Sequence, residues 1–251
     1  MRKFRQLIQG LGLLLSSTLL VGAIVLAEAR YVGRTCQGID IMVSNGAQRL
    51  IQKEALLKSL TANTSESIIG APLPSLSTRR IENTVKSHNF VREGIAYKDW
   101  KGTLKIALIP RRPIARILYP HQQSRYIDED GTFLPLSGQY TARVMLVEVE
   151  KDDFKQNLRA HVRGAALLAL LNYIDQDPFW RAQIAYLHVN EKGKIVMTTQ
   201  VSKQRIEFGL PEAIEKKFAK LKLFYKQIIP YKGWNTYKRV NLEFDNQIVC
   251  E

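Results

Sequence analysis

The residue types that most often form covalent or metal-ligand bonds are sparse in this sequence. Cys36 and Cys250 are the only cysteines, and in an oxidising compartment such an even pair could form a disulfide. They can bond only if the fold brings their α-carbons to about 4.4–6.8 Å, which the sequence leaves open. We expect no metal site and no cofactor, because the histidines form no ligand-spaced cluster and are scattered at His88, His121, His161 and His188.

Three acids precede a glycine at 128–131. Such a cluster could suggest a calcium loop. An EF-hand register, however, would put Tyr126 and Ser137 at positions that need an acid and a bidentate glutamate. The segment is therefore predicted to be a hairpin turn.

No catalytic motif is present. The sequence has no Gly-x-Ser-x-Gly elbow, no Walker loop, no dinucleotide fingerprint and no His-Glu-x-x-His pair. Single serines and histidines are too common to argue for catalysis. We therefore expect a protein that is not an enzyme and has no small-molecule substrate.

The charge is strongly basic, with 37 Lys and Arg against 23 Asp and Glu and a net charge of +14. These cations are interspersed rather than gathered into a block of five or six, and no aromatic-glycine strand or Cys/His finger accompanies them. The pattern favours a basic face near anionic phospholipid or cell-wall polymer over binding to nucleic acid. With 45% hydrophobic residues over 251 positions, the chain can build one large core or two modest ones.

The N-terminus decides the expected topology. A basic tail, 1–6, precedes an uncharged apolar run, 7–27, whose 21 residues would form a helix of about 31 Å, enough to cross a bilayer. Cations before the span and none within it put the tail in the cytoplasm and the remainder outside. A short polar stalk, 28–37, would come next.

A cleaved signal peptide is the competing interpretation of the same run. Ala27-Glu28-Ala29 resembles a cleavage site, but a signal h-region has roughly 7–15 apolar residues and this run is longer. We favour an uncleaved anchor, and both interpretations export the rest of the chain.

The elements expected after the stalk form two groups. The first, 38–110, has the order β-α-α-β-β: a strand at 39–43, a helix from Gln48 to Leu60, a helix capped by Ser77 or Thr78, and two strands that meet at Lys101-Gly102. The second, 111–251, is predicted as a mixed α/β domain with a largely antiparallel sheet. The fold class is therefore α+β.

Within the second group, short strands are expected at 114–119, 126–127 and 144–149, a helix at 158–174, and a strand meander over 184–208. Pro211 is predicted to open a helix with an apolar stripe from Ile214 to Ile228. Four lysines are assigned to its solvent face, namely Lys216, Lys217, Lys220 and Lys226. A final strand pair, with Val240, Leu242 and Phe244 alternating, is expected to end at Cys250.

This order of elements resembles the bacterial cell-division protein family FtsQ, called DivIB in Gram-positive bacteria, in the form found in Bacteroidetes-type bacteria. The basic tail, the single span and the POTRA-like β-α-α-β-β module carry part of the likeness. Four motifs in order carry the rest: 104–115 resembles the junction strand, 126–131 the Tyr-Leu-Asp-x-x-Gly turn, 205–209 a strand-glycine-helix, and 240–250 the closing strand. Pro110 departs from the family, which often has Glu there.

The resemblance implies a non-enzymatic, single-pass inner-membrane scaffold at the division septum, whose bulk is periplasmic. It would recruit partners for septal peptidoglycan synthesis through FtsB-like and FtsL-like bitopic division proteins. The family's partner edge carries over here to the closing strand at Phe244, Asn246, Gln247, Ile248 and Val249. An extended partner could pair with that edge. The alternative is that Val240, Leu242 and Phe244 simply complete the core, and the two roles are compatible.

Two other functions remain. A POTRA-bearing accessory of envelope protein export would share the first module, but should continue into a barrel or further POTRA repeats. An exported hydrolase would need convergent acids in a concave site, whereas the acids here lie in turns and on expected surfaces.

Overall fold

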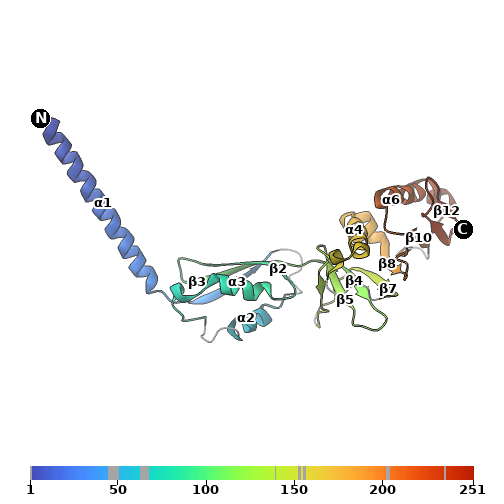
Figure 1. Ribbon diagram of the computed structural model, residues 1–251, viewed down its shortest axis with the longest axis horizontal. Coiled ribbons are helices and arrows are strands. Elements are labelled where there is room, and N and C mark those ends of the chain that lie inside the picture. The colour runs from blue at the N-terminus through green and yellow to red at the C-terminus, as the bar shows by residue number, and fades with distance from the viewer. Residues whose placement is uncertain are drawn as a thin grey trace. The chain divides into compact units, whose positions relative to one another are not determined.

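The computed structural model describes residues 2–44, 51–62, 68–138, 140–151, 154, 157–201, 204–234 and 236–251. The side chains of 2–11, 13, 29–32 and 62 lie outside this description, as do the turn expected at Asn45-Gly46 and the start of the helix predicted from Gln48. The chain divides into two compact units, 1–110 and 111–251, whose elements are labelled in Figure 1.

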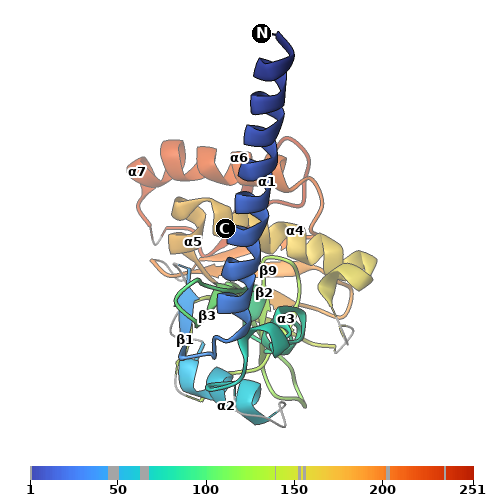
Figure 2. The ribbon, with the colours of Figure 1, turned by 90° about the vertical axis from the view of Figure 1, so that its left-hand side faces the viewer.

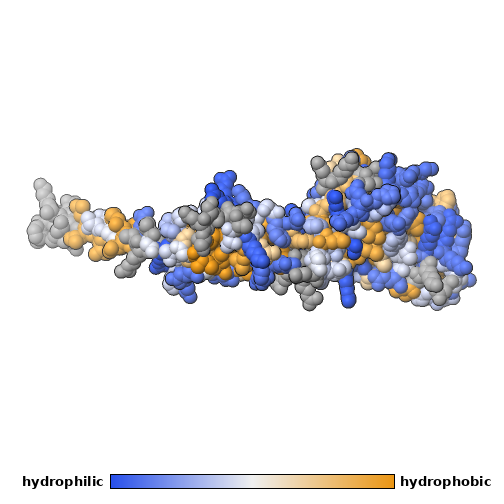
Figure 3. All heavy atoms as spheres, turned by 90° about the horizontal axis from the view of Figure 1, so that it is seen from below, coloured by the Kyte–Doolittle hydropathy of each residue, from blue (hydrophilic) through white to orange (hydrophobic). Residues whose placement is uncertain are grey.

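Unit 1 begins with a long helix, α1 (Arg2–Val32). In its described part, large apolar side chains are exposed at Leu14, Leu15, Leu19, Leu20, Val21, Ile24, Val25 and Leu26 (Figure 3). Among the helices as far as their side chains are described, none is both long and apolar enough to cross a membrane. The expected span at 7–27 includes residues outside that description, so it stays a prediction.

The remainder of unit 1 has the predicted β-α-α-β-β order. Its elements are β1 (Gly38–Val43), α2 (Lys53–Ala62), the 3-10 turn η2 (Leu73–Ser75), α3 (Thr78–Lys86), β2 (Val91–Lys98) and β3 (Thr103–Pro110). The strands form a sheet in the order β1-β3-β2, with β1 parallel and β2 antiparallel to β3. Ser77 caps α3, as expected, because its hydroxyl accepts a hydrogen bond from the Arg80 amide.

The core of unit 1 reflects strand alternation. In β3, Leu104, Ile106 and Leu108 are almost completely buried while the residues between them are not. Val85 of α3 and Leu56 of α2 are fully buried as well. Burying one side chain in two along the strand against apolar helix positions gives this small unit its core.

Unit 2 contains a sheet of nine strands with helices between some of them. Along the chain these are β4 (Pro113–Leu118), β5 (Arg125–Asp128), β6 (Phe133–Leu134), β7 (Met145–Val149), η3 (Leu158–Ala160), α4 (Val162–Gln176), α5 (Pro178–Gln183), β8 (Ile184–Val189), β9 (Ile195–Thr199), β10 (Arg205–Gly209), α6 (Ile214–Leu223), the π-turn η4 (Phe224–Ile228), α7 (Ile229–Lys232), β11 (Arg239–Asn241) and β12 (Val249–Cys250).

The strand order is β12-β11-β10-β9-β8-β7-β4-β5-β6. Five neighbouring pairs are antiparallel and three, β4/β7, β7/β8 and β10/β11, are parallel. The sheet is therefore largely antiparallel, as expected, but it has a parallel section around β7 that the sequence did not indicate. In Figure 2, α4, α5, α6 and α7 gather beside this sheet.

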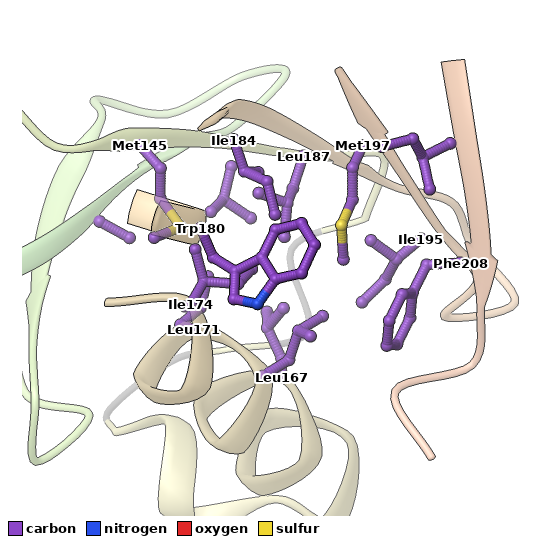
Figure 4. Close-up of a cluster of buried hydrophobic side chains, with 14 of the residues drawn as sticks. Met145, Leu167, Leu171, Ile174, Trp180, Ile184, Leu187, Ile195, Met197 and Phe208 are labelled. Carbon is purple, nitrogen blue, oxygen red and sulfur yellow. The ribbon is translucent and has the colours of Figure 1, made fainter. Parts of the chain in front are cut away.

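The core of unit 2 lies between α4 to α6 and one face of the sheet. Trp180 of α5 is only 1% exposed and points between the strands and α4, among side chains of both (Figure 4). Its ring lies 4.8 Å from that of Phe218 in α6, which in turn lies 5.5 Å from Phe208 in β10. These tilted aromatic contacts fix α6 against the sheet.

Two helix predictions need correction. The helix expected at 158–174 is a 3-10 turn followed by α4, because His161 between them is extended. The helix expected from Pro211 begins only at Ile214, because Ala213 adopts a left-handed conformation at φ 47°.

The hairpin turn expected at 128–131 is confirmed, since β5 and β6 pair antiparallel around it. The carboxylate of Asp128 accepts hydrogen bonds from the Asp130 and Thr132 amides, and Gly131 has φ 79°. Asp128 therefore stabilises the turn itself, whereas Glu129 and Asp130 form ion pairs with Arg112 and Arg159.

Arg111 and Arg112 fix the start of unit 2. Arg111 binds Asp128 at 2.7 Å and Arg112 binds Asp175 at 2.6 Å, and both carboxylates are buried. The side-chain hydrogen bond to Asp175 is the largest cause that raises the pKa of Arg112. The two residues that connect β3 to β4 are thus anchored in unit 2 rather than forming a free linker.

The close packing of Gly164 in α4 gives a test of this core. A methyl group there would overlap the carbonyl oxygen of Leu158, so we expect Gly164→Ala to lower the free energy of unfolding of unit 2 by about 1–3 kcal/mol. Denaturant unfolding followed by Trp180 fluorescence measures the effect. In the described part of the chain, nothing lies within 4 Å of a methyl group added at Gly138, so an equal loss in Gly138→Ala would contradict this explanation.

Candidate functional site

The C-terminal end of the sheet is the candidate site. β12 is one of the two edge strands of this sheet, and it pairs antiparallel with β11, with Val240 opposite Cys250 and Asn241 opposite Val249. In the described part of the chain, no strand pairs with the outer edge of β12. An unpaired edge presents a row of amide and carbonyl groups that another strand can use.

The pairing of Glu251 determines the direction of each amide on β12. Arg239 and Glu251 exchange two backbone hydrogen bonds, each of 3.0 Å. In an antiparallel ladder the next residue along then points its amide and carbonyl away from the partner strand. Cys250 therefore directs its amide and carbonyl groups to the open edge. If the ladder continued by two residues, Ile248 would direct its own amide and carbonyl the same way.

The structure places the five predicted site residues unevenly. Only Val249 lies in a strand, β12. Phe244 is 48% exposed in the turn after β11, and Asn246 in the same turn is left-handed at φ 57°. Gln247 is exposed, and Ile248 is half-buried against the core. The strand expected to continue through Leu242 and Phe244 ends at Asn241, so this site is a turn followed by a short edge strand.

Two lysines of α6 hold this region, and their assignment to a solvent face is wrong. Lys217 Nζ donates hydrogen bonds to the carbonyl oxygens of Phe208 and Leu210 at 2.8 and 2.7 Å. Lys220 Nζ donates to the carbonyl oxygen of Leu242 at 3.0 Å. It reaches two further carbonyl oxygens, those of Phe244 at 2.6 Å and Gln247 at 3.5 Å.

The physical reason lies in the helix period. Lys217 directly precedes the buried Phe218, and Lys220 directly precedes the buried Leu221. Each lysine therefore lies about 100° around the helix from a core residue. At that border a lysine stem can run along apolar surface and bring its ammonium to backbone carbonyls. Desolvation by this partial burial lowers the pKa of Lys217. The sequence did contain a local indication of these contacts, because each lysine stands directly before an apolar residue of the predicted core stripe.

A second network holds β11 and β12 together. Arg239 binds Glu207 of β10 through two hydrogen bonds of 2.8 Å and Glu251 through one of 2.9 Å. Asn241 also donates to the Glu207 carboxylate, at 2.9 Å. The Arg239 hydrogen bonds are the largest cause that lowers the pKa of Glu207, and the same contacts raise the pKa of Arg239.

Glu243 connects the turn after β11 to Lys194, the residue directly before β9. Its carboxylate binds Lys194 at 2.7 Å, and its amide donates to the side chain of Asn241 at 2.8 Å. The same side chain packs over Gly209, where φ is 73° and a Cβ would meet Glu243 Cγ at 2.6 Å. The glycine expected in the strand-glycine-helix motif is thus required by both conformation and space.

The remaining candidate residues, Cys36 and Cys250, are free thiols. Cys36 is buried in unit 1, while Cys250 of β12 is half-buried, and desolvation raises its pKa. They belong to different units, so their pairing stays a prediction. Among the described residues, no group of three or more His, Cys, Asp or Glu side chains could hold a metal ion.

Comparison with known families decides the identity of the fold. A family model described as FtsQ/DivIB, C-terminal related, matches residues 112–251, and a POTRA-like domain model matches residues 34–109. The chain belongs to the FtsQ/DivIB family. Both matched domains are of non-catalytic, scaffold type, and the family gives the chain a role in cell division. No curated protein matches the chain.

The three hydrogen bonds from Lys220 to the carbonyl oxygens of Leu242, Phe244 and Gln247, here called the Lys220 clamp, can be tested by replacing the lysine. Lys220→Met keeps the apolar stem but leaves three carbonyl oxygens without their charged donor, so we expect a loss of about 2 kcal/mol in unfolding free energy and faster amide hydrogen exchange over 242–251. Lys216→Met is the matched control, because Lys216 is exposed on the same helix. Equal exchange in the two variants would show that the clamp does not order the turn.

The ion pair of Glu207 with Arg239 should make the stability of unit 2 depend on pH. Because the folded pKa of Glu207 is lowered, its contribution to stability is present above the unfolded pKa of about 4.3 and is lost as the pH falls through the folded pKa. When unfolding is measured at a series of pH values from 7 to 3, the free energy of unfolding should therefore fall in the wild type. It should fall less in Glu207→Gln. Parallel curves for the two proteins would rule out this role for Glu207.

Proposed function

We propose that this protein is a non-enzymatic scaffold of the divisome, anchored in the inner membrane by a single N-terminal helix. Its tail, 1–6, would be cytoplasmic and residues 28–251 periplasmic, and it would act at the septum. There it recruits the partner proteins needed for septal peptidoglycan synthesis, with FtsB-like and FtsL-like bitopic proteins as the expected partners.

The open edge of β12 is the observation that carries this proposal. A scaffold acts by recognition, and an extended segment of a partner can add a strand to such an edge. Main-chain hydrogen bonds to Cys250 and Ile248 would supply affinity, and side chains at alternate positions would set the register. The exposed ring of Phe244 (48%) gives the partner an apolar anchor next to the strand.

The clamp and the Arg239 network support the same function through preorganisation. Binding costs less free energy when the receiving surface is already ordered. Lys220 fixes the turn that carries Phe244, and Arg239 holds β11 to Glu251. The edge is thus fixed before any partner arrives.

The exposed apolar side chains of α1 support the membrane anchor. Leu19 is 75% exposed and Leu20, Ile24 and Leu26 are at least 56% exposed. A helix with apolar residues around much of its circumference is at home in lipid or in a large core. Arg2, Lys3 and Arg5 before it favour retention of the N-terminus in the cytoplasm.

Localisation of the full chain tests the function as a whole. Fused to a fluorescent protein, it should concentrate at midcell in dividing cells and co-purify with bitopic division proteins. A uniform envelope signal with export-machinery proteins as the co-purified set would favour the POTRA-bearing accessory instead.

The binding edge has its own test. Cys250→Pro removes the one outward amide that lies within β12, and an edge strand tolerates proline better than a central strand. We expect partner binding to fall at least tenfold while the thermal unfolding transition is kept. Cys250→Ala is the matched control, since it removes the thiol and retains the amide.

Phe244→Ala examines the side-chain part of the same interface. Truncation of an aromatic anchor commonly costs about 2 kcal/mol of binding free energy, so affinity should fall roughly thirtyfold. Full binding by folded Cys250→Pro and Phe244→Ala would mean that the partner docks elsewhere.

A further inference from the structure

Two large apolar side chains are exposed at one end of unit 1. Trp100, in the turn between β2 and β3, is 74% exposed, and Ile69, before η2, is 56% exposed. An isolated exposed apolar residue needs no explanation. These two, however, lie in turns that flank the same short segment, 34–37.

Hydrogen bonds hold both turns against that segment. Arg34 donates from its guanidinium to the carbonyl oxygen of Trp100, and the Gln37 amide donates to the Gly102 carbonyl at 2.9 Å. On the other side, the Gly70 amide donates to the Cys36 carbonyl at 2.7 Å. Since only Gly33 separates α1 from Arg34, both exposed side chains lie beside the place where α1 ends.

The charge around this end is basic. Arg34 and Lys101 are exposed, Lys98 is half-buried, and Lys101 Nζ lies 5.3 Å from the Trp100 ring centre. The nearby acid, Asp99, is used by the turn, because its carboxylate accepts hydrogen bonds from the Lys101 and Thr103 amides, each of 2.8 Å. The surface therefore combines an aromatic ring, an aliphatic side chain and several cations.

We propose that this surface, formed by Trp100, Ile69, Arg34, Lys98 and Lys101, contacts the headgroup region of an anionic phospholipid bilayer. Tryptophan favours the membrane interface, where its ring is partly apolar and its N–H remains hydrated. Lysine and arginine next to it are attracted by anionic headgroups. The inference rests on the proposed function, since α1 must bring this end of unit 1 to the membrane.

The contact would have a mechanical consequence for unit 1. A single span alone leaves a following domain free to tilt about the residue that connects the two, which here is Gly33. Two hydrogen-bonded turns that enter the interface beside the helix would limit that tilt and fix the height of unit 1 above the membrane.

The experiment uses the full chain reconstituted in vesicles of phosphatidylethanolamine and phosphatidylglycerol. Tryptophan fluorescence is measured with and without lipids that carry a nitroxide near the headgroup. We expect a blue-shifted emission and quenching that is largely lost in Trp100→Phe but retained in Trp234→Phe, because Trp234 belongs to unit 2. Replacing phosphatidylglycerol with phosphatidylcholine, or Lys98 and Lys101 with glutamine, should reduce the quenching.

Alkaline carbonate extraction of the same vesicles separates the two hypotheses. Protein that stays with the vesicles while Trp100 is not quenched keeps the anchor and overturns the interfacial contact. Protein that is released overturns both. Retained protein with equal quenching in wild type and Trp100→Phe also overturns the contact, whereas a loss specific to Trp100→Phe supports it.

Discussion

The position of α6 on the sheet is the constraint on which the C-terminal edge depends. Phe218 packs between Trp180 and Phe208 with its ring tilted against both. These contacts fix both the position of the helix and its rotation about its own axis. Once Phe218 and Leu221 are buried, the lysines that precede them are directed to the ends of β10 and β11. The ordered turn after β11 is therefore a consequence of core packing several residues away.

Several charged side chains in the described part of unit 2 bind backbone carbonyls or buried carboxylates. Lys217 and Lys220 donate to carbonyl oxygens, and Arg111 and Arg112 bind carboxylates that are buried. Such charge-assisted hydrogen bonds are stronger than those between neutral groups, and each compensates groups that would otherwise be buried without a partner. Some of the lysines and arginines thus stabilise the fold. Composition alone cannot distinguish these residues from cations that bind a partner.

An edge strand carries a risk of unspecific pairing, and here the edge is short. β12 contains only Val249 and Cys250, and short edge strands are one way in which proteins limit aggregation. A partner would have to match both the few open main-chain groups and the neighbouring Phe244. Under the proposed function, a short edge of this kind would restrict which partner segments can bind.

The sequence by itself determined the order of the elements in unit 1, the Ser77 cap and the hairpin turn at 128–131. These depend on residues close together in the chain, where alternation, helix period and turn chemistry act locally. Only the tertiary structure decided that the parallel strands β4, β7 and β8 lie side by side within the sheet, and that Lys220 reaches Leu242 rather than solvent. Those features join residues that are far apart in sequence, such as Glu207 with Arg239 and Arg112 with Asp175, and no local pattern records which distant group will fill a neighbouring space.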